Sequence, residues 1–73
     1  NITDVDASFV LYKTGSTVNI SARSLGAMNV QIVMEQLGGG GHQTMAATQI
    51  DNVSVQEAVK SLILAIDDFR NNN

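Results

Sequence analysis

The chain contains no cysteine, no proline and no tryptophan, and only four of its 73 residues are basic. Without cysteine it has neither a disulfide nor a thiol nucleophile. No apolar run approaches the roughly 18 residues of a membrane-spanning helix, and no signal peptide is visible. A protein that binds extended nucleic acid presents a stripe of basic side chains. Here the net charge is −3 and the basic residues are scattered: Lys13, Arg23, Lys60 and Arg70. These absences favour a small ligand, held locally, over a long polyanion.

The length of the chain allows one domain. We expect that domain to cover residues 1–73 and to bury roughly 60% of the surface that the unfolded chain exposes. An apolar content of 44% supports a globular fold. The sequence starts at Asn1 rather than methionine and ends in three asparagines. We therefore expect a single domain excised from a larger protein.

Alternating apolar residues predict three strands. Residues 6–13 and 17–23 are rich in β-formers and flank a short turn with glycine, which is typical of an antiparallel hairpin. Residues 6–13 carry apolar side chains on both faces, as in a strand that is covered on two sides. Residues 44–50 predict a third strand, in which small residues blur the alternation.

Two helices follow from their caps and their apolar spacing. Asn29 is placed to cap a short helix that reaches Leu37, with apolar residues at positions i, i+3, i+4 and i+7. Ser54 and Glu57 form a capping box at the start of a helix that runs to about residue 70. The expected fold is α+β: a small mixed sheet with two helices, in the order β-β-α-β-α. If the second and third strands lie parallel, the crossover between them is expected to be right-handed.

The segment at residues 38–42, Gly-Gly-Gly-Gly-His, points most directly to function. Gly38 alone suffices to end the preceding helix in a left-handed conformation. The next three glycines leave bare backbone that can approach a ligand closely, and successive amides turned inward form a concave anion site. His42 adds a side chain that can donate from a ring nitrogen. A flexible linker is disfavoured because apolar periodic sequence flanks the run, and a tight turn without function is the other alternative.

Arg23 and Ser24 stand at the end of the second expected strand. The planar guanidinium group suits a pair of phosphate oxygens, and a serine hydroxyl can donate beside it. An arginine at a strand end is most often a solvated surface residue. This segment and the glycine run bracket the same short helix, so we expect both on one rim of the sheet, around a shared pocket.

The chain lacks the parts of a catalytic centre. One histidine and dispersed carboxylates cannot supply the ligand cluster of a hydrolytic metal site. No Ser-His-Asp or Cys-His set can be nominated either. We expect the chain to bind a ligand and to hold no catalytic residue, metal or cofactor of its own.

Four segments together resemble the C-terminal substrate-binding domain of the DHH phosphoesterase superfamily, over roughly residues 5–70. In chain order they are Ser21-Ala22-Arg23-Ser24, Asn29-Val30-Gln31, Leu37-Gly38-Gly39-Gly40-Gly41-His42 and Ala46-Ala47. The residues on either side of the glycine run are most similar to the membrane-anchored, GdpP-type cyclic-di-AMP phosphodiesterases of bacteria. In that superfamily a preceding domain with an Asp-His-His triplet holds two manganese ions. The C-terminal domain closes over the substrate from across a cleft.

The resemblance implies a parent hydrolase that converts cyclic di-AMP to linear pApA, anchored in the cell membrane, with this domain in the cytoplasm. No Asp-His-His triplet occurs here, so we expect the chain alone to be inactive. The implied partners are a cyclic dinucleotide or short oligonucleotide, the parent's DHH domain and a second copy of the chain. The implied contacts to substrate are Arg23, Ser24, Gly39, Gly40, Gly41 and His42.

Other functions remain open from the sequence. Within the same superfamily, the parent could be an oligoribonucleotide (nano-RNA) phosphodiesterase or a phosphoadenosine phosphatase. A nucleic-acid-binding module, which the low basic content disfavours, and a non-catalytic nucleotide sensor are the alternatives from other classes.

Overall fold

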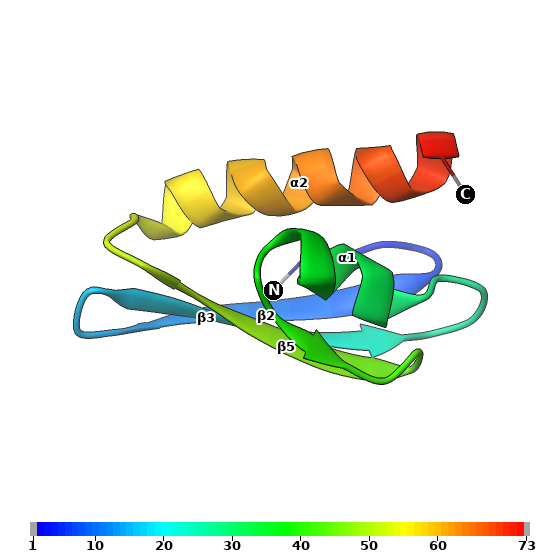
Figure 1. Ribbon diagram of the computed structural model, residues 1–73, viewed down its shortest axis with the longest axis horizontal. Coiled ribbons are helices and arrows are strands. Elements are labelled where there is room, and N and C mark those ends of the chain that lie inside the picture. The colour runs from blue at the N-terminus through cyan, green and yellow to red at the C-terminus, as the bar shows by residue number, and fades with distance from the viewer. Residues whose placement is uncertain (1, 73) are drawn as a thin grey trace.

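The computed structural model describes residues 2–72, which form one five-stranded sheet and two helices. Both helices lie on the same side of the sheet, and its other side is bare (Figure 1). The α+β class and the order of the three long strands and two helices are confirmed. Two further strands, β1 and β4, have two residues each. The elements are β1 (Ile2–Thr3), β2 (Ala7–Thr14), β3 (Thr17–Ser24), α1 (Val30–Gln36), β4 (Gly40–Gly41), β5 (Met45–Asp51) and α2 (Val55–Asn72).

Every strand pair among the described residues is antiparallel, in the order β1-β2-β3-β5-β4, so the expectation of a mixed sheet is wrong. The reason is the length of α1. A helix of seven residues advances about 10 Å, whereas the eight residues of β3 span about 26 Å. The helix is too short to carry the chain back to the start of β3, as a parallel crossover requires. Instead β5 begins where β3 ends, with Met45 opposite Arg23.

The β2–β3 hairpin has the predicted position and a tight loop. Thr14 pairs with Thr17, so only two residues lie in the loop, and Gly15 has a φ of +60°. This register pairs Ser8 with Arg23 and Val10 with Ser21. Side chains that are directly opposite in a sheet share a face, so these four belong to one surface.

The core lies between the sheet and the helices. Alternate residues of the long strands face the helices, and most of them are buried. The buried strand residues on this side are Ala7, Phe9, Val18, Ile20, Ala22, Ala46 and Thr48. On the opposite face, Val10 and Tyr12 are 41% and 51% exposed. The expectation that residues 6–13 are covered on two sides is therefore wrong for this domain.

Both predicted helix caps are present. The Oδ1 atom of Asn29 accepts hydrogen bonds from the main-chain N–H groups of Gln31 and Ile32, at 3.1 and 3.4 Å. Ser54 and Glu57 satisfy each other's main-chain N–H groups at 2.8 and 3.0 Å. The core residues of the helices are Val30, Val33 and Met34 in α1, and Ala58, Leu62, Ala65 and Ile66 in α2.

Candidate functional site

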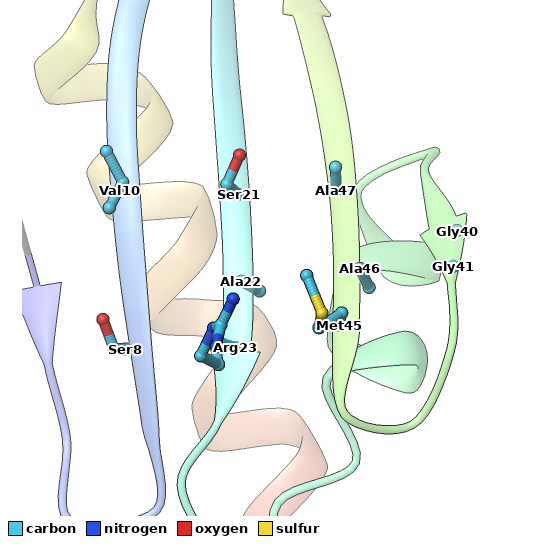
Figure 2. Close-up of a pocket in the computed structure, with 10 residues that line it drawn as sticks. All are labelled: Ser8, Val10, Ser21, Ala22, Arg23, Gly40, Gly41, Met45, Ala46 and Ala47. Carbon is cyan, nitrogen blue, oxygen red and sulfur yellow. The ribbon is translucent and has the colours of Figure 1, made fainter.

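A hollow of about 550 Å³ lies on the bare face of the sheet, and Arg23 is the one charged residue that lines it. We call it the Arg23 hollow (Figure 2). Its walls come from all four neighbouring strands, β2, β3, β5 and β4. The lining residues are Ser8, Val10, Ser21, Ala22, Arg23, Gly40, Gly41, Met45, Ala46 and Ala47.

Strand register explains why these residues meet. One row across the sheet is Ser8, Arg23 and Met45, and the next is Val10, Ser21, Ala47 and Gly40. In Figure 2 the two rows run side by side on the face turned away from the helices. The structure thus places Arg23 and part of the glycine run in one hollow, as the sequence predicts.

The guanidinium group of Arg23 is free to bind a ligand. The side chain is exposed, and within residues 2–72 it forms no ion pair with a carboxylate. Arg70, by contrast, pairs with Asp4 and lies 3.5 Å from the Oδ2 atom of Asp6. An unpaired arginine beside apolar atoms can give both of its donor edges to a phosphate or carboxylate group.

The first two glycines of the run end helix α1. Gly38 has a φ of +85°, and its N–H group donates to the carbonyl oxygen of Glu35 at 3.1 Å. The N–H group of Gly39 donates to the carbonyl oxygen of Met34 at 2.9 Å. This pair of bonds is the Schellman motif. Capping therefore uses two glycines, where the sequence argument assigned one.

Gly39 and Gly41 are required by close packing against β5. A Cβ atom on Gly39 would lie 2.1 Å from the carbonyl oxygen of Ala47, and one on Gly41 would lie 2.6 Å from the Cα atom of Ala46. Gly41 also has a φ of +145°. Gly40 differs, because a Cβ atom there would meet nothing within 4 Å. Gly40 is therefore the glycine of this run whose missing side chain leaves space in the Arg23 hollow and is not required by packing.

The amides of the run do not form the concave anion site that we expected. Those of Gly38 and Gly39 donate to α1, and that of His42 donates to the carbonyl oxygen of Met45 at 2.7 Å. Alternation from the His42–Met45 bond makes Gly40 and Ala47 the next hydrogen-bonding pair of the β4–β5 ladder. Four of the five amides in residues 38–42 are therefore occupied within the protein. The bare backbone matters at this site by leaving space, and the cation that can meet an anion is Arg23.

Ser24 and His42 lie outside the Arg23 hollow. The Oγ atom of Ser24 is engaged in a turn: it donates to the carbonyl oxygen of Gly26 at 3.0 Å and accepts from the N–H of Gly26 at 3.3 Å. His42 is exposed at the turn between β4 and β5. Gly39 lines a second hollow, described next, and its role toward a ligand stays a prediction together with those of Ser24 and His42.

The second hollow, of about 420 Å³, lies at the edge of β5 and contains no charged residue. We call it the Gln49 hollow. Ala47 borders both hollows, so the two adjoin along β5. The residues that line it are Gly38, Gly39, Ala47, Thr48 and Gln49.

Sequence reasoning missed the apolar part of the site. Val10 and Met45 line the Arg23 hollow and are 41% and 54% exposed. The two-residue hairpin loop contained the signal for Val10, because it fixes the partner of every residue in β2. Nothing comparable located Met45, since its position depends on how the chain returns from α1.

Among the described residues, no three His, Asp or Glu side chains are grouped so that they could hold a metal ion. Nor does either helix combine the length and the apolar character that spanning a bilayer requires. Within residues 2–72 the candidate site therefore combines one cation with apolar and serine side chains, and no metal-ligand cluster lies in it.

Comparison with known families places the domain as a whole. The family model described as the DHHA1 domain matches residues 1–72. The chain belongs to the DHHA1 domain family. The DHH-associated domain proposed from the glycine run and its flanking residues is thereby confirmed.

Three curated relatives of this DHHA1 domain are phosphodiesterases by name. It is 56% identical over 69 residues, or 93% of the chain, to the cyclic-di-AMP phosphodiesterase GdpP of Geobacillus thermodenitrificans. It is 54% identical to the cyclic-di-AMP phosphodiesterases PdeA of Listeria monocytogenes and GdpP of Bacillus subtilis, over 89% and 94% of the chain. The matched region spans 10%, 10% and 11% of these three relatives, about a tenth of each.

Proposed function

We propose that this DHHA1 domain is the substrate-binding half of a bacterial DHH-family phosphodiesterase that hydrolyses cyclic di-AMP to linear pApA. The observation that carries the proposal is the Arg23 hollow, in which one unpaired cation lies beside the bare backbone of Gly40 on an uncovered sheet face. The relatives that are named cyclic-di-AMP phosphodiesterases support the choice of ligand.

The chemistry of the hollow suits a nucleotide. Arg23 is placed to bind a phosphate group through two parallel N–H···O bonds. Val10 and Met45 offer apolar surface for a ribose or the flat face of a base. The open space at Gly40 admits the ligand to the sheet. The domain's task in this proposal is to bind and orient the dinucleotide.

Hydrolysis belongs to another part of the parent protein in this proposal. Two manganese ions in a DHH domain across the cleft would activate water for attack on the phosphodiester. The described residues of this chain contain no group of His, Asp and Glu side chains that would fit a metal ion. We also propose that the parent is anchored in the cell membrane with this domain on the cytoplasmic side, and that it assembles as a homodimer.

The test is calorimetric titration of cyclic di-AMP into the full-length parent and into its Arg23→Ala variant. Loss of a charge-assisted hydrogen-bonded contact costs about 1.5 to 3 kcal/mol, so affinity should fall by about tenfold to over a hundredfold. Lys13→Ala and Lys60→Ala each remove one positive charge outside the hollow. Both variants should bind cyclic di-AMP as tightly as the unsubstituted full-length protein does. Equal, small effects at all three positions would show that Arg23 is an ordinary surface residue.

A further inference from the structure

The Gln49 hollow marks the place where the β4–β5 pairing stops. Gly40 pairs with Ala47, and the N–H of His42 donates to the carbonyl oxygen of Met45. Alternation in an antiparallel ladder makes Gly38 and Gln49 the next hydrogen-bonding pair. Gly38 cannot take that place, because its N–H group donates to Glu35 in the cap of α1. The main-chain N–H and C=O of Gln49 therefore point from the sheet edge into the hollow without a strand partner among residues 2–72.

The other side of β5 supports this assignment. The N–H of Asn52 donates to the carbonyl oxygen of Ser16, and the N–H of Ser24 donates to that of Thr44. The even-numbered residues of β5 thus make the hydrogen bonds to β3. Gln49 lies opposite Asn19 in a pair without main-chain bonds, so its main-chain polar groups point the other way.

Neighbouring hydrogen bonds also fix the orientation of the Gln49 carboxamide. Asn19 is 8% exposed, and its Nδ2 atom donates to the carbonyl oxygen of Tyr12 at 3.4 Å and to the Oγ1 atom of Thr14 at 2.8 Å. A main-chain carbonyl only accepts, so the amide of Asn19 cannot be flipped. Its Oδ1 atom then faces Gln49, whose Nε2 atom donates to it at 3.0 Å. Gln49 is left with its Oε1 acceptor and one N–H donor for a ligand.

The Oε1 acceptor and the remaining N–H donor of Gln49 form the pattern that recognises adenine. A glutamine carboxamide binds the adenine edge through two bonds, accepting from the N6 amino group and donating to N7. Guanine presents a carbonyl oxygen in place of the amino group, and that oxygen would face Oε1 of Gln49 with two acceptors opposed. Because Asn19 prevents the carboxamide from rotating, it cannot adapt to guanine.

The spacing from Arg23 suits one nucleotide unit. Arg23 lies opposite Met45, and Gln49 is four residues further along β5, or about 13 Å at 3.3 Å per residue. The side chains of Arg23 and Gln49 are long, so their terminal groups can lie closer together than their main chains do. Resting on the proposed function, we infer that a phosphate of the substrate binds Arg23 while its adenine base enters the Gln49 hollow, where Gln49 selects adenine against guanine.

The test measures base selectivity in the full-length parent. kcat/KM is determined for cyclic di-AMP, the mixed cyclic GMP–AMP and cyclic di-GMP, in the parent and in Gln49→Ala. The unsubstituted protein should prefer cyclic di-AMP. The ratio of kcat/KM for cyclic di-AMP to kcat/KM for cyclic di-GMP should fall by about five- to a hundredfold in Gln49→Ala. Gln49→Met keeps the length of the side chain and should show the same loss. Gln56→Ala, the same change on the exposed first turn of α2, should leave the ratio unchanged.

The outcomes separate the two proposals. If both Gln49 variants keep the selectivity of the parent, or lose activity on all three substrates equally, Gln49 does not read the base and the inference is wrong. If the parent does not hydrolyse cyclic di-AMP at all, the proposed function itself is refuted, and the inference falls with it.

Discussion

The two faces of the sheet differ in almost every property, although they are built from the same three strands. On the helix side, alternate residues such as Phe9 and Ile20 are at most 1% exposed and pack against the helices. On the bare side, the intervening residues Val10 and Met45 are about half exposed, and Arg23 has no ion-pair partner in the described chain. The helix side holds the fold together, and the bare side is available to a ligand.

The glycine run serves both faces, which explains why its members are not equivalent. Gly38 and Gly39 end α1, and Gly39 and Gly41 pack against the main chain of β5. Gly40 adjoins the open hollow and has free space where a side chain would stand. A motif that looks uniform in the sequence thus contains three glycines that the fold requires and one that borders open space.

The largest expected effect compares Phe9 with Val10, adjacent residues on opposite faces of β2. Phe9→Ala opens a cavity in the core and should lower the free energy of unfolding by about 3 to 5 kcal/mol. Val10→Ala removes an exposed side chain and should change it by about 0.5 kcal/mol or less. Urea denaturation of the domain measures both. A cost at Val10 close to that at Phe9 would mean that the bare face is covered after all.

The next comparison is between Gly39 and Gly40. Gly39→Ala forces a Cβ atom against the carbonyl oxygen of Ala47 and should cost about 1 to 3 kcal/mol of stability, as overpacking does. A Cβ atom added at Gly40 has no protein atom within 4 Å, so circular dichroism and denaturation of Gly40→Val should resemble those of the unsubstituted protein. The valine side chain should obstruct the hollow. Titration with cyclic di-AMP should then show no binding. A folded Gly40→Val protein that binds normally would reduce the glycine run to a turn.

The smallest expected effect is on pH dependence, at the ion pair that joins the two ends of the domain. The main-chain N–H of Asp6, and then Arg70, lower the pKa of Asp4 below its ordinary value of 3.8. Because the pKa is lower in the folded state, the stabilising contribution is complete above the unfolded value and disappears as pH falls through the folded one. The free energy of unfolding of Asp4→Asn should therefore be lower than that of the unsubstituted protein above pH 4. The difference between the two should vanish in stronger acid.

A matched control for this effect is Asp67→Asn, an exposed carboxylate on α2 without an ion pair in the described chain. Its free energy of unfolding should follow that of the unsubstituted protein across the acid range. If the difference between Asp4→Asn and the parent stays constant between neutral pH and strong acid, the charge of Asp4 does not contribute to stability.

Local patterns predicted the elements well because their causes are local. The cap at Asn29 and the capping box at Ser54 require only residues within three positions, and both are present. The hairpin also depends on a short loop. The arrangement of β5 does not, because it depends on how the distance that α1 can cover compares with the length of β3. The mixed sheet was wrong for this reason.

The candidate site was predictable only in part. Arg23 and the glycine run lie together because both flank α1, which the sequence shows. The engagement of the Gly38 and Gly39 amides by α1 is a local Schellman cap. The close packing that requires glycine at position 39 follows from a contact with Ala47 of β5 that no local pattern encodes. Gln49 was missed for a similar reason, because its role depends on where the pairing with β4 ends.

Under the proposed function, the unequal glycines also give a way to follow ligand binding in descendants of this sequence. A descendant that no longer binds a nucleotide would keep Gly38, Gly39 and Gly41, since a side chain at any of them strains the cap of α1 or its packing against β5. Gly40 would drift toward the residues that suit an edge strand. In any lineage, glycine at position 40 can be compared with glycine at positions 38, 39 and 41. If position 40 also remains glycine, selection for ligand binding persists.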